Sequence, residues 1–224
     1  MKKLLYITAS PKPETESVSK QAGRAFVDRF LSENPDYTVE ELDLPTASLP
    51  QPNQHCFTGR CSLVGGPELD TLSETDRMAV QRMNELCTQF LSADVYVIAS
   101  PMWSLSFPAW LKQYIDCIML NGRLLRITTG GVCGLLDDKP RKMVYIQSSG
   151  GVYPKVLYGQ LNVGIKYIHD LFRHLGIHEF HKVLIQGTDM PEIGKDKAMA
   201  AASEDFECAL KSVSRPLQRV AVSI

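Results

Sequence analysis

The sequence lacks an excess of charge of either sign, and it lacks a long apolar run. Its 24 Lys and Arg residues oppose 25 Asp and Glu residues, which leaves a formal net charge of −1. Proteins that depend on nucleic-acid phosphates usually carry a marked basic excess, so we expect no nucleic-acid partner. No apolar run approaches the roughly 18–20 residues of a membrane-spanning helix, and the apolar stretch at residues 4–7 is too short for a signal peptide. We therefore expect no membrane partner.

Closely spaced cysteine pairs are almost absent as well. Of the six cysteines, only Cys56 and Cys61 are near one another, with His55 beside the first. Their spacing is too wide for the usual zinc knuckle and no second pair completes four ligands, so we predict a plain loop and no metal site. Scattered single cysteines are typical of reduced thiols. This pattern predicts a cytoplasmic protein.

What the sequence does contain is the composition of an ordinary globular protein. Hydrophobic residues make up 44% of the chain and charged residues 22%, which argues against disorder and against fibrous classes. A chain of 224 residues can bury roughly 70–75% of the surface that it exposes when unfolded. We expect residues 1–224 to form a single domain.

Short apolar runs alternate with stretches of helical periodicity. The runs at residues 3–8, 39–44, 95–99, 143–147 and 182–186 are typical of buried strands. Helical patterns begin after Ser17 and at Pro108, and others span 83–91 and 161–175. The last pattern predicts one helix over 196–214. Because apolar strands separated by helices indicate a parallel sheet covered on both faces, we predict an α/β fold. Five strands favour the flavodoxin-like, doubly wound arrangement.

The first predicted strand ends in a loop rich in hydroxyl groups that runs into a helix. Free backbone N–H groups at such a helix start, together with Ser10, Ser17, Val18 and Ser19, favour an anion site, most often for phosphate. The loop contains neither Gly-x-Gly-x-x-Gly nor Gly-Lys-Ser/Thr, which excludes the dinucleotide fingerprint and the nucleotide-triphosphate loop. The alternative is that the serines merely cap the helix.

Two later strands end in loops suited to a flat ligand. The third is followed by Met102, Trp103, Ser104 and Leu105 between two stiffening prolines, a segment that fits the edge of a heteroaromatic ring or, alternatively, packs as core. The fourth is followed by Ser148, Ser149, Gly150 and Gly151, where the two glycines allow the backbone to approach a ligand closely. The alternative is an ordinary glycine turn. Strands one, three and four are neighbours in a flavodoxin-like sheet, so we expect all three loops to meet.

The segment from Pro101 to Asp116, Pro-Met-Trp-Ser-Leu-Ser-Phe-Pro-Ala-Trp-Leu-Lys-Gln-Tyr-Ile-Asp, resembles a motif of the FMN-dependent NADH:quinone oxidoreductases and azoreductases. The resemblance extends from Lys3 to about Gly187. It implies that Ser10 and Ser17-Val18-Ser19 bind the FMN phosphate. It also implies that Met102-Trp103-Ser104-Leu105 and Ser148-Ser149-Gly150-Gly151 border the isoalloxazine ring.

The resemblance further implies a homodimeric enzyme that takes a hydride from NADH or NADPH and passes two electrons to a quinone or azo compound. A flavodoxin-type FMN electron carrier without an NADH site is the alternative. Tyr153 is a candidate proton donor, since a phenol near the ring can serve acid catalysis or packing. Two departures stand out. Ser104 replaces the usual Asn, and Leu125-Arg126-Ile127 replaces aromatics that we expect beside the flavin.

Overall fold

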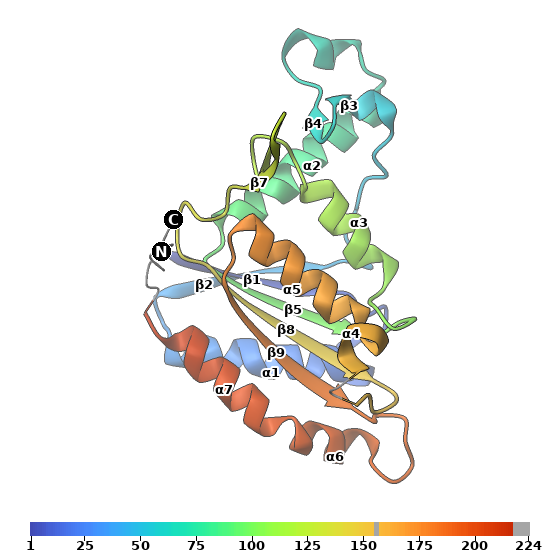
Figure 1. Ribbon diagram of the computed structural model, residues 1–224, viewed down its shortest axis with the longest axis vertical. Helices are drawn as coiled ribbons and strands as arrows, with labels where there is room; N and C mark the ends of the chain where they lie inside the picture. The colour runs from blue at the N-terminus through green and yellow to red at the C-terminus, as the bar shows by residue number, and fades with distance from the viewer. Residues whose placement is uncertain (155–156, 217–224) are drawn as a thin grey trace.

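The computed structural model describes residues 1–154 and 157–216. Five parallel strands form one sheet in the order β2-β1-β5-β8-β9 (Figure 1). Their bounds are Lys2–Thr8 for β1, Tyr37–Asp43 for β2, Val95–Pro101 for β5, Lys142–Ser149 for β8 and Glu179–Gln186 for β9. The predicted flavodoxin-like sheet is confirmed, including the adjacency of the first, third and fourth predicted strands.

Helices cover both faces of the sheet, each with its own apolar layer. On one face lie α1 (Val18–Glu33), α6 (Gly194–Ala201) and α7 (Ser203–Ser214), packed on alternate side chains of the strands. On the other face lie α2 (Glu74–Ser92), α3 (Ala109–Ile118) and α5 (Val163–Leu175), with the short α4 (Tyr158–Leu161) before α5. The central strands read as continuous apolar runs because both of their faces are buried.

The last predicted helix is wrong in one respect. The stretch predicted as one helix over 196–214 is two helices, separated by a turn at Ala202, which has a φ of −87° and a ψ of −1°. Ala202 is buried on the sheet, and no glycine or proline marks the interruption. The apolar spacing continues through it, so the pattern alone predicts a continuous helix.

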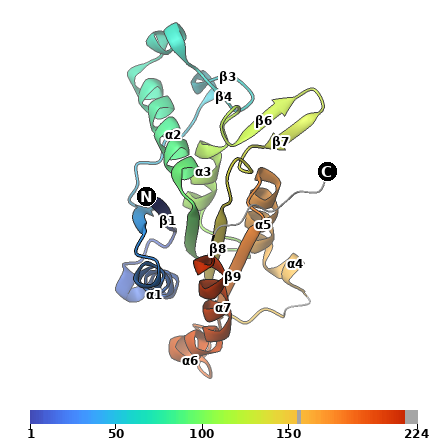
Figure 2. The same ribbon diagram turned by 90° about the vertical axis from the view of Figure 1, so that its left-hand side faces the viewer.

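Two small hairpins extend beyond α2 and α3, away from the sheet (Figures 1 and 2). One pairs β3 (Phe57–Gly59) with β4 (Ser62–Leu63), between the 3-10 turns η2 (Gln54–Cys56) and η3 (Gly66–Thr71). The other pairs β6 (Leu125–Thr128) with β7 (Gly131–Gly134) and lies beside the carboxyl end of α5, where Leu136 N–H donates to Leu175 O. Within the described residues, no helix is long and apolar enough to cross a membrane.

Candidate active site

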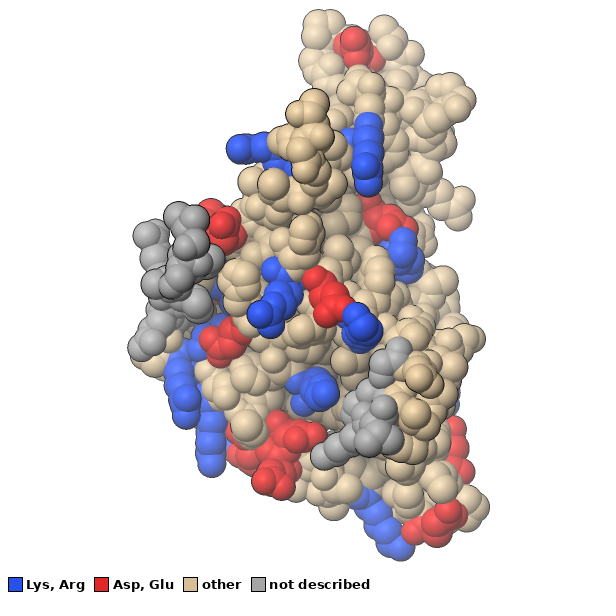
Figure 3. Space-filling view, viewed as in Figure 1, with Lys and Arg blue, Asp and Glu red and all other residues tan. Residues whose placement is uncertain are grey.

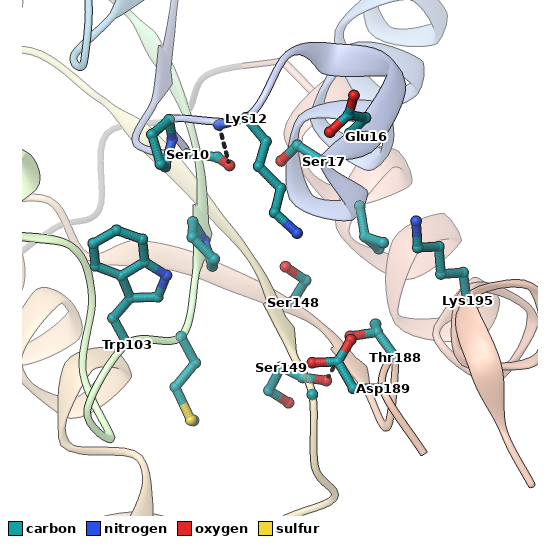
Figure 4. Close-up of a pocket in the computed structure, with 15 residues that line it drawn as sticks. Ser10, Lys12, Glu16, Ser17, Trp103, Ser148, Ser149, Thr188, Asp189 and Lys195 are labelled. Carbon is teal, nitrogen blue, oxygen red and sulfur yellow. Dashed lines mark hydrogen bonds between the residues drawn. The ribbon is translucent and has the colours of Figure 1, made fainter. Parts of the chain in front are cut away.

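A pocket lies at the carboxyl ends of β1, β5 and β8, where three loops meet (Figure 4). The strand register brings these ends together: Thr8 lies opposite Ala99, and Pro101 lies opposite Ser148. Met102 N–H donates to Ser148 O over 2.7 Å, which ties the loop after β5 to the end of β8. The lining residues are Ser10, Pro11, Lys12, Glu16, Ser17, Val18, Pro101, Met102, Trp103, Ser148, Ser149, Gly150, Thr188, Asp189 and Lys195.

The start of α1 forms one wall of this pocket. Ser17 caps the helix, and its Oγ accepts from Lys20 N–H and lies 3.3 Å from Ser19 Oγ. In the part of the chain that the structure describes, the backbone N–H groups of Val18 and Ser19 have no hydrogen-bond partner. The first turn of a 16-residue helix thus offers free donors at its positive dipole end, the arrangement that binds phosphate.

This helix start is held in place from the side away from the pocket. The Tyr6 hydroxyl donates to Lys20 O over 3.0 Å, and burial raises the pKa of that phenol. The Lys20 ammonium pairs with Asp43 at 2.9 Å, and Thr8 Oγ1 donates to the same carboxylate. The charge of Lys20 is therefore neutralised by β2 and does not face the pocket wall.

A tight turn at residues 103–106 forms the opposite wall. Trp103 and Ser106 exchange both backbone hydrogen bonds, and the two residues between them have positive φ, 48° at Ser104 and 62° at Leu105. Left-handed backbone is uncommon for residues other than glycine and concentrates at functional sites. The turn leaves Trp103 44% exposed at the pocket, and its ring contacts the ring of Trp110.

The loop after β8 is fixed by the segment that follows β9. Gly187 N–H donates to Ser149 O and Gly151 O, Thr188 N–H and Oγ1 both donate to Ser149 O, and Asp189 N–H donates to Gly150 O. A Cβ at Gly150 would lie 2.4 Å from the Asp189 carboxylate, so a larger residue there would displace the Asp189 side chain. Sequence reasoning missed Thr188, Asp189 and Lys195, because nothing marks the loop after the fifth strand as part of a site.

The structure brings most of the predicted site residues to this pocket. Ser10, Ser17, Val18, Met102, Trp103, Ser148, Ser149 and Gly150 line it. Ser19 lies behind Ser17, while Ser104, Leu105 and Gly151 belong to the bordering turns without lining the pocket. Tyr153 lies further along, its N–H donating to Gln186 Oε1, and its catalytic role stays a prediction.

The expectation that Leu125 lies beside the flavin does not hold within one chain. Leu125 is buried in the apolar cluster that includes residues of α2, α3 and α5, and it does not line the pocket. Its hairpin contacts the carboxyl end of α5, whereas Gly164 at the amino end of α5 packs on Ser106 (Figure 2). The length of α5 therefore separates Leu125 from the site.

Comparison with known proteins agrees with this fold. A family model described as a flavodoxin-like fold matches residues 2–209, so the chain belongs to the flavodoxin-like fold family. The FMN-dependent NADH:quinone oxidoreductase 1 of Clostridium acetobutylicum is 48% identical over 207 residues, which cover 92% of this chain and 94% of that protein. The FMN-dependent NADH:quinone oxidoreductase of Clostridium botulinum is 44% identical over 214 residues, 95% of this chain and all of that one.

A solved structure is similar across nearly the whole chain. The FMN-dependent NADH-azoreductase of Bacillus anthracis, in complex with FMN, is 29% identical with a TM-score of 0.79, covering 95% of this chain and 99% of its own. Within the flavodoxin-like proteins, this chain belongs to the FMN-dependent NADH:quinone oxidoreductase and azoreductase family.

Proposed function

We propose that the protein is an FMN-dependent oxidoreductase that uses NADH to reduce quinones or azo compounds. The observation that carries this proposal is the pocket itself, which pairs the free N–H groups at the start of α1 with an exposed tryptophan on the facing wall. Such a pocket suits a ligand with a phosphate at one end and a flat ring at the other. The names of the relatives supply the cofactor, the reductant and the two acceptor classes.

The residues of the pocket fit FMN. The N–H groups of Val18 and Ser19 and the hydroxyls of Ser10 and Ser17 would hold the phosphate, since hydrogen bonds to a charged group are the stronger ones. The turn at 103–106 and the loop at 148–151 would border the ring. When bound, FMN supplies the chemistry, accepting a hydride and returning two electrons.

The protein's own contribution is to position the cofactor and the groups around it. Strand β5 and the tight turn orient Trp103. The hydrogen bonds that residues 187–189 donate to the carbonyl groups of residues 149–151 fix the facing loop. Backbone N–H groups on these fixed loops would stabilise negative charge that develops on the ring. No nucleophilic side chain is needed, and Tyr153 stays the candidate proton donor.

The experiment that tests this function is an anaerobic titration of the purified protein with NADH, after its bound cofactor has been identified. We expect rapid bleaching of the flavin absorbance by NADH alone and its return on adding a quinone. A flavodoxin-type carrier would bind FMN without being bleached. Absence of FMN binding altogether would overturn the proposal.

We propose also that the active form is a homodimer. Apolar side chains are exposed beside the pocket mouth, namely Trp103, Leu105, Val163 and Tyr167. They form one surface, because Gly164 N–H donates to Leu105 O and the rings of Phe107 and Tyr167 are 5.7 Å apart. Exposed apolar surface of this kind marks interaction sites.

A second copy is the partner that the charges of this protein favour. On the face seen in Figure 3, side chains of both signs occur, with one acidic cluster at the lower left, and the net charge of −1 gives two copies little overall repulsion. Light scattering should give a dimer mass, and full activity of a monomer at nanomolar dilution would contradict the dimer.

The free thiols of the described cysteines favour action in the cytoplasm.

A further inference from the structure

Two lysines that the sequence analysis did not name as site residues line the pocket. Lys12 lies in the loop between β1 and η1 (Glu14–Glu16), and Lys195 lies in the first turn of α6. They reach the pocket from opposite sides of α1, and Figure 4 shows the Lys12 side chain extending past Ser17 toward Ser148. Both side chains are exposed to solvent.

These two ammonium groups differ from most other lysines of the protein in having no partner. Within residues 1–154 and 157–216, neither Lys12 nor Lys195 forms an ion pair or a side-chain hydrogen bond. Elsewhere, the ammonium groups of seven lysines form ion pairs with carboxylates, namely those of Lys2, Lys3, Lys20, Lys112, Lys139, Lys142 and Lys166. The pocket thus holds two ammonium groups that form no ion pair with the described residues.

The fold also keeps the lysines near the helix start. The backbone N–H of Lys12 donates to Ser10 Oγ over 3.3 Å, which fixes the loop beside the serine at the end of β1. Lys195 lines the same pocket as Val18, in the first turn of α1. Two carboxylates, Glu16 and Asp189, line the pocket too, but among the described residues neither forms an ion pair with Lys12 or Lys195. The cations therefore stay available for an external anion.

We propose that Lys12 and Lys195 clamp the phosphate of FMN and make the pocket select FMN over riboflavin. This inference rests on the proposed function, and it concerns how the cofactor is chosen. A phosphate monoester carries about −1.5 to −2 charge at neutral pH, which neutral serine and backbone donors leave uncompensated. Two ammonium groups compensate that charge and add no contact to a flavin that lacks the phosphate.

The test compares the binding of FMN and of riboflavin to the apoprotein by quenching of flavin fluorescence. Lys12→Met and Lys195→Met remove each charge and keep an unbranched apolar stem. We expect each variant to bind FMN roughly tenfold more weakly or worse, as for one lost hydrogen bond to a charged group, and riboflavin with nearly unchanged affinity. Added salt should weaken FMN binding more in the wild type than in the double variant.

Lys197→Met is the matched control. Lys197 lies two residues beyond Lys195 on the same helix, does not line the pocket, and donates to Glu192 O. Its substitution makes the same change in net charge and should leave both affinities unchanged. Thermal unfolding of each variant checks that the fold is intact.

Three results would overturn the clamp. Equal losses for FMN and riboflavin would assign the lysines to pocket shape, and unchanged FMN affinity with a raised KM for NADH would assign them to the pyrophosphate of the reductant. If Lys197→Met lost as much affinity for FMN as Lys195→Met, the loss would be due to the change in overall charge and not to a contact with the phosphate. A wild-type protein that binds neither flavin would instead refute the proposed function.

Discussion

Trp103 and Ser106 close a two-residue hairpin in which each backbone N–H donates to the other's carbonyl, over 3.2 and 2.8 Å. The two residues inside it, Ser104 and Leu105, both adopt left-handed backbone. Such turns normally contain Asn-Gly or Asp-Gly, because those residues tolerate positive φ. This wall of the pocket therefore contains two residues, Ser104 and Leu105, in a backbone conformation that residues of their type disfavour.

Ser104→Asn should stabilise the protein. Serine at φ 48° is strained, whereas asparagine is several-fold enriched in this region, so we expect a gain of about 0.5–1 kcal/mol in the free energy of unfolding. Chemical denaturation measures it. Ser106→Asn, at a position with ordinary φ, is the control, and an equal gain there would show that the backbone is not the cause.

Gly164→Ala should destabilise the fold and disturb the tight turn. A Cβ at Gly164 would lie 2.9 Å from backbone atoms of Ser106, so α5 and the turn must move apart, at a cost of about 1–3 kcal/mol. Gly130→Ala is the matched control, since its Cβ would meet only Thr128 Oγ1 at 3.8 Å. Equal unfolding midpoints for the two variants would contradict this packing.

The Ser17→Ala, Ser19→Ala double variant should bind FMN tens-fold more weakly, and riboflavin much less so. Each hydrogen bond to a charged phosphate is worth roughly 1.5–3 kcal/mol, and riboflavin lacks the phosphate. Titration of the apoprotein with each flavin measures the two affinities. Similar losses for both flavins would place the phosphate elsewhere.

Steady-state kinetics should be of the ping-pong type. If NADH and the acceptor occupy the same face of the flavin beside Trp103, they cannot bind together. Reciprocal plots against NADH at several quinone concentrations should then be parallel. Intersecting lines, or a complex with both ligands bound, would exclude a shared face.

Thiol labelling at about pH 8 should modify Cys133 and Cys208 first. Both are exposed, whereas burial raises the pKa of Cys87 to about 11 and that of Cys117 to about 12, so these two stay protonated and unreactive. Labelling followed by peptide mass analysis identifies the modified sites. Rapid modification of Cys87 in the folded protein would show that its helix opens.

The sequence by itself determined the sheet, its helices and three of the loops that form the pocket. Apolar strands and capped helices are local patterns, and the Pro101–Asp116 motif is contiguous, so each is legible along the chain. The serine at position 104 is also visible as a departure, but its consequence, a strained left-handed residue, depends on φ and appears only in the folded turn.

Tertiary structure alone decided which further residues reach the pocket and which do not. Asp189 reaches the pocket from the loop after β9 and Lys195 from α6, because the sheet places β9 beside β8. No short-range pattern encodes that neighbour. Leu125, expected beside the flavin, is buried instead at the far end of α5. Contacts between distant segments follow from strand order and helix packing, and these arise only when the whole chain buries its apolar surface at once.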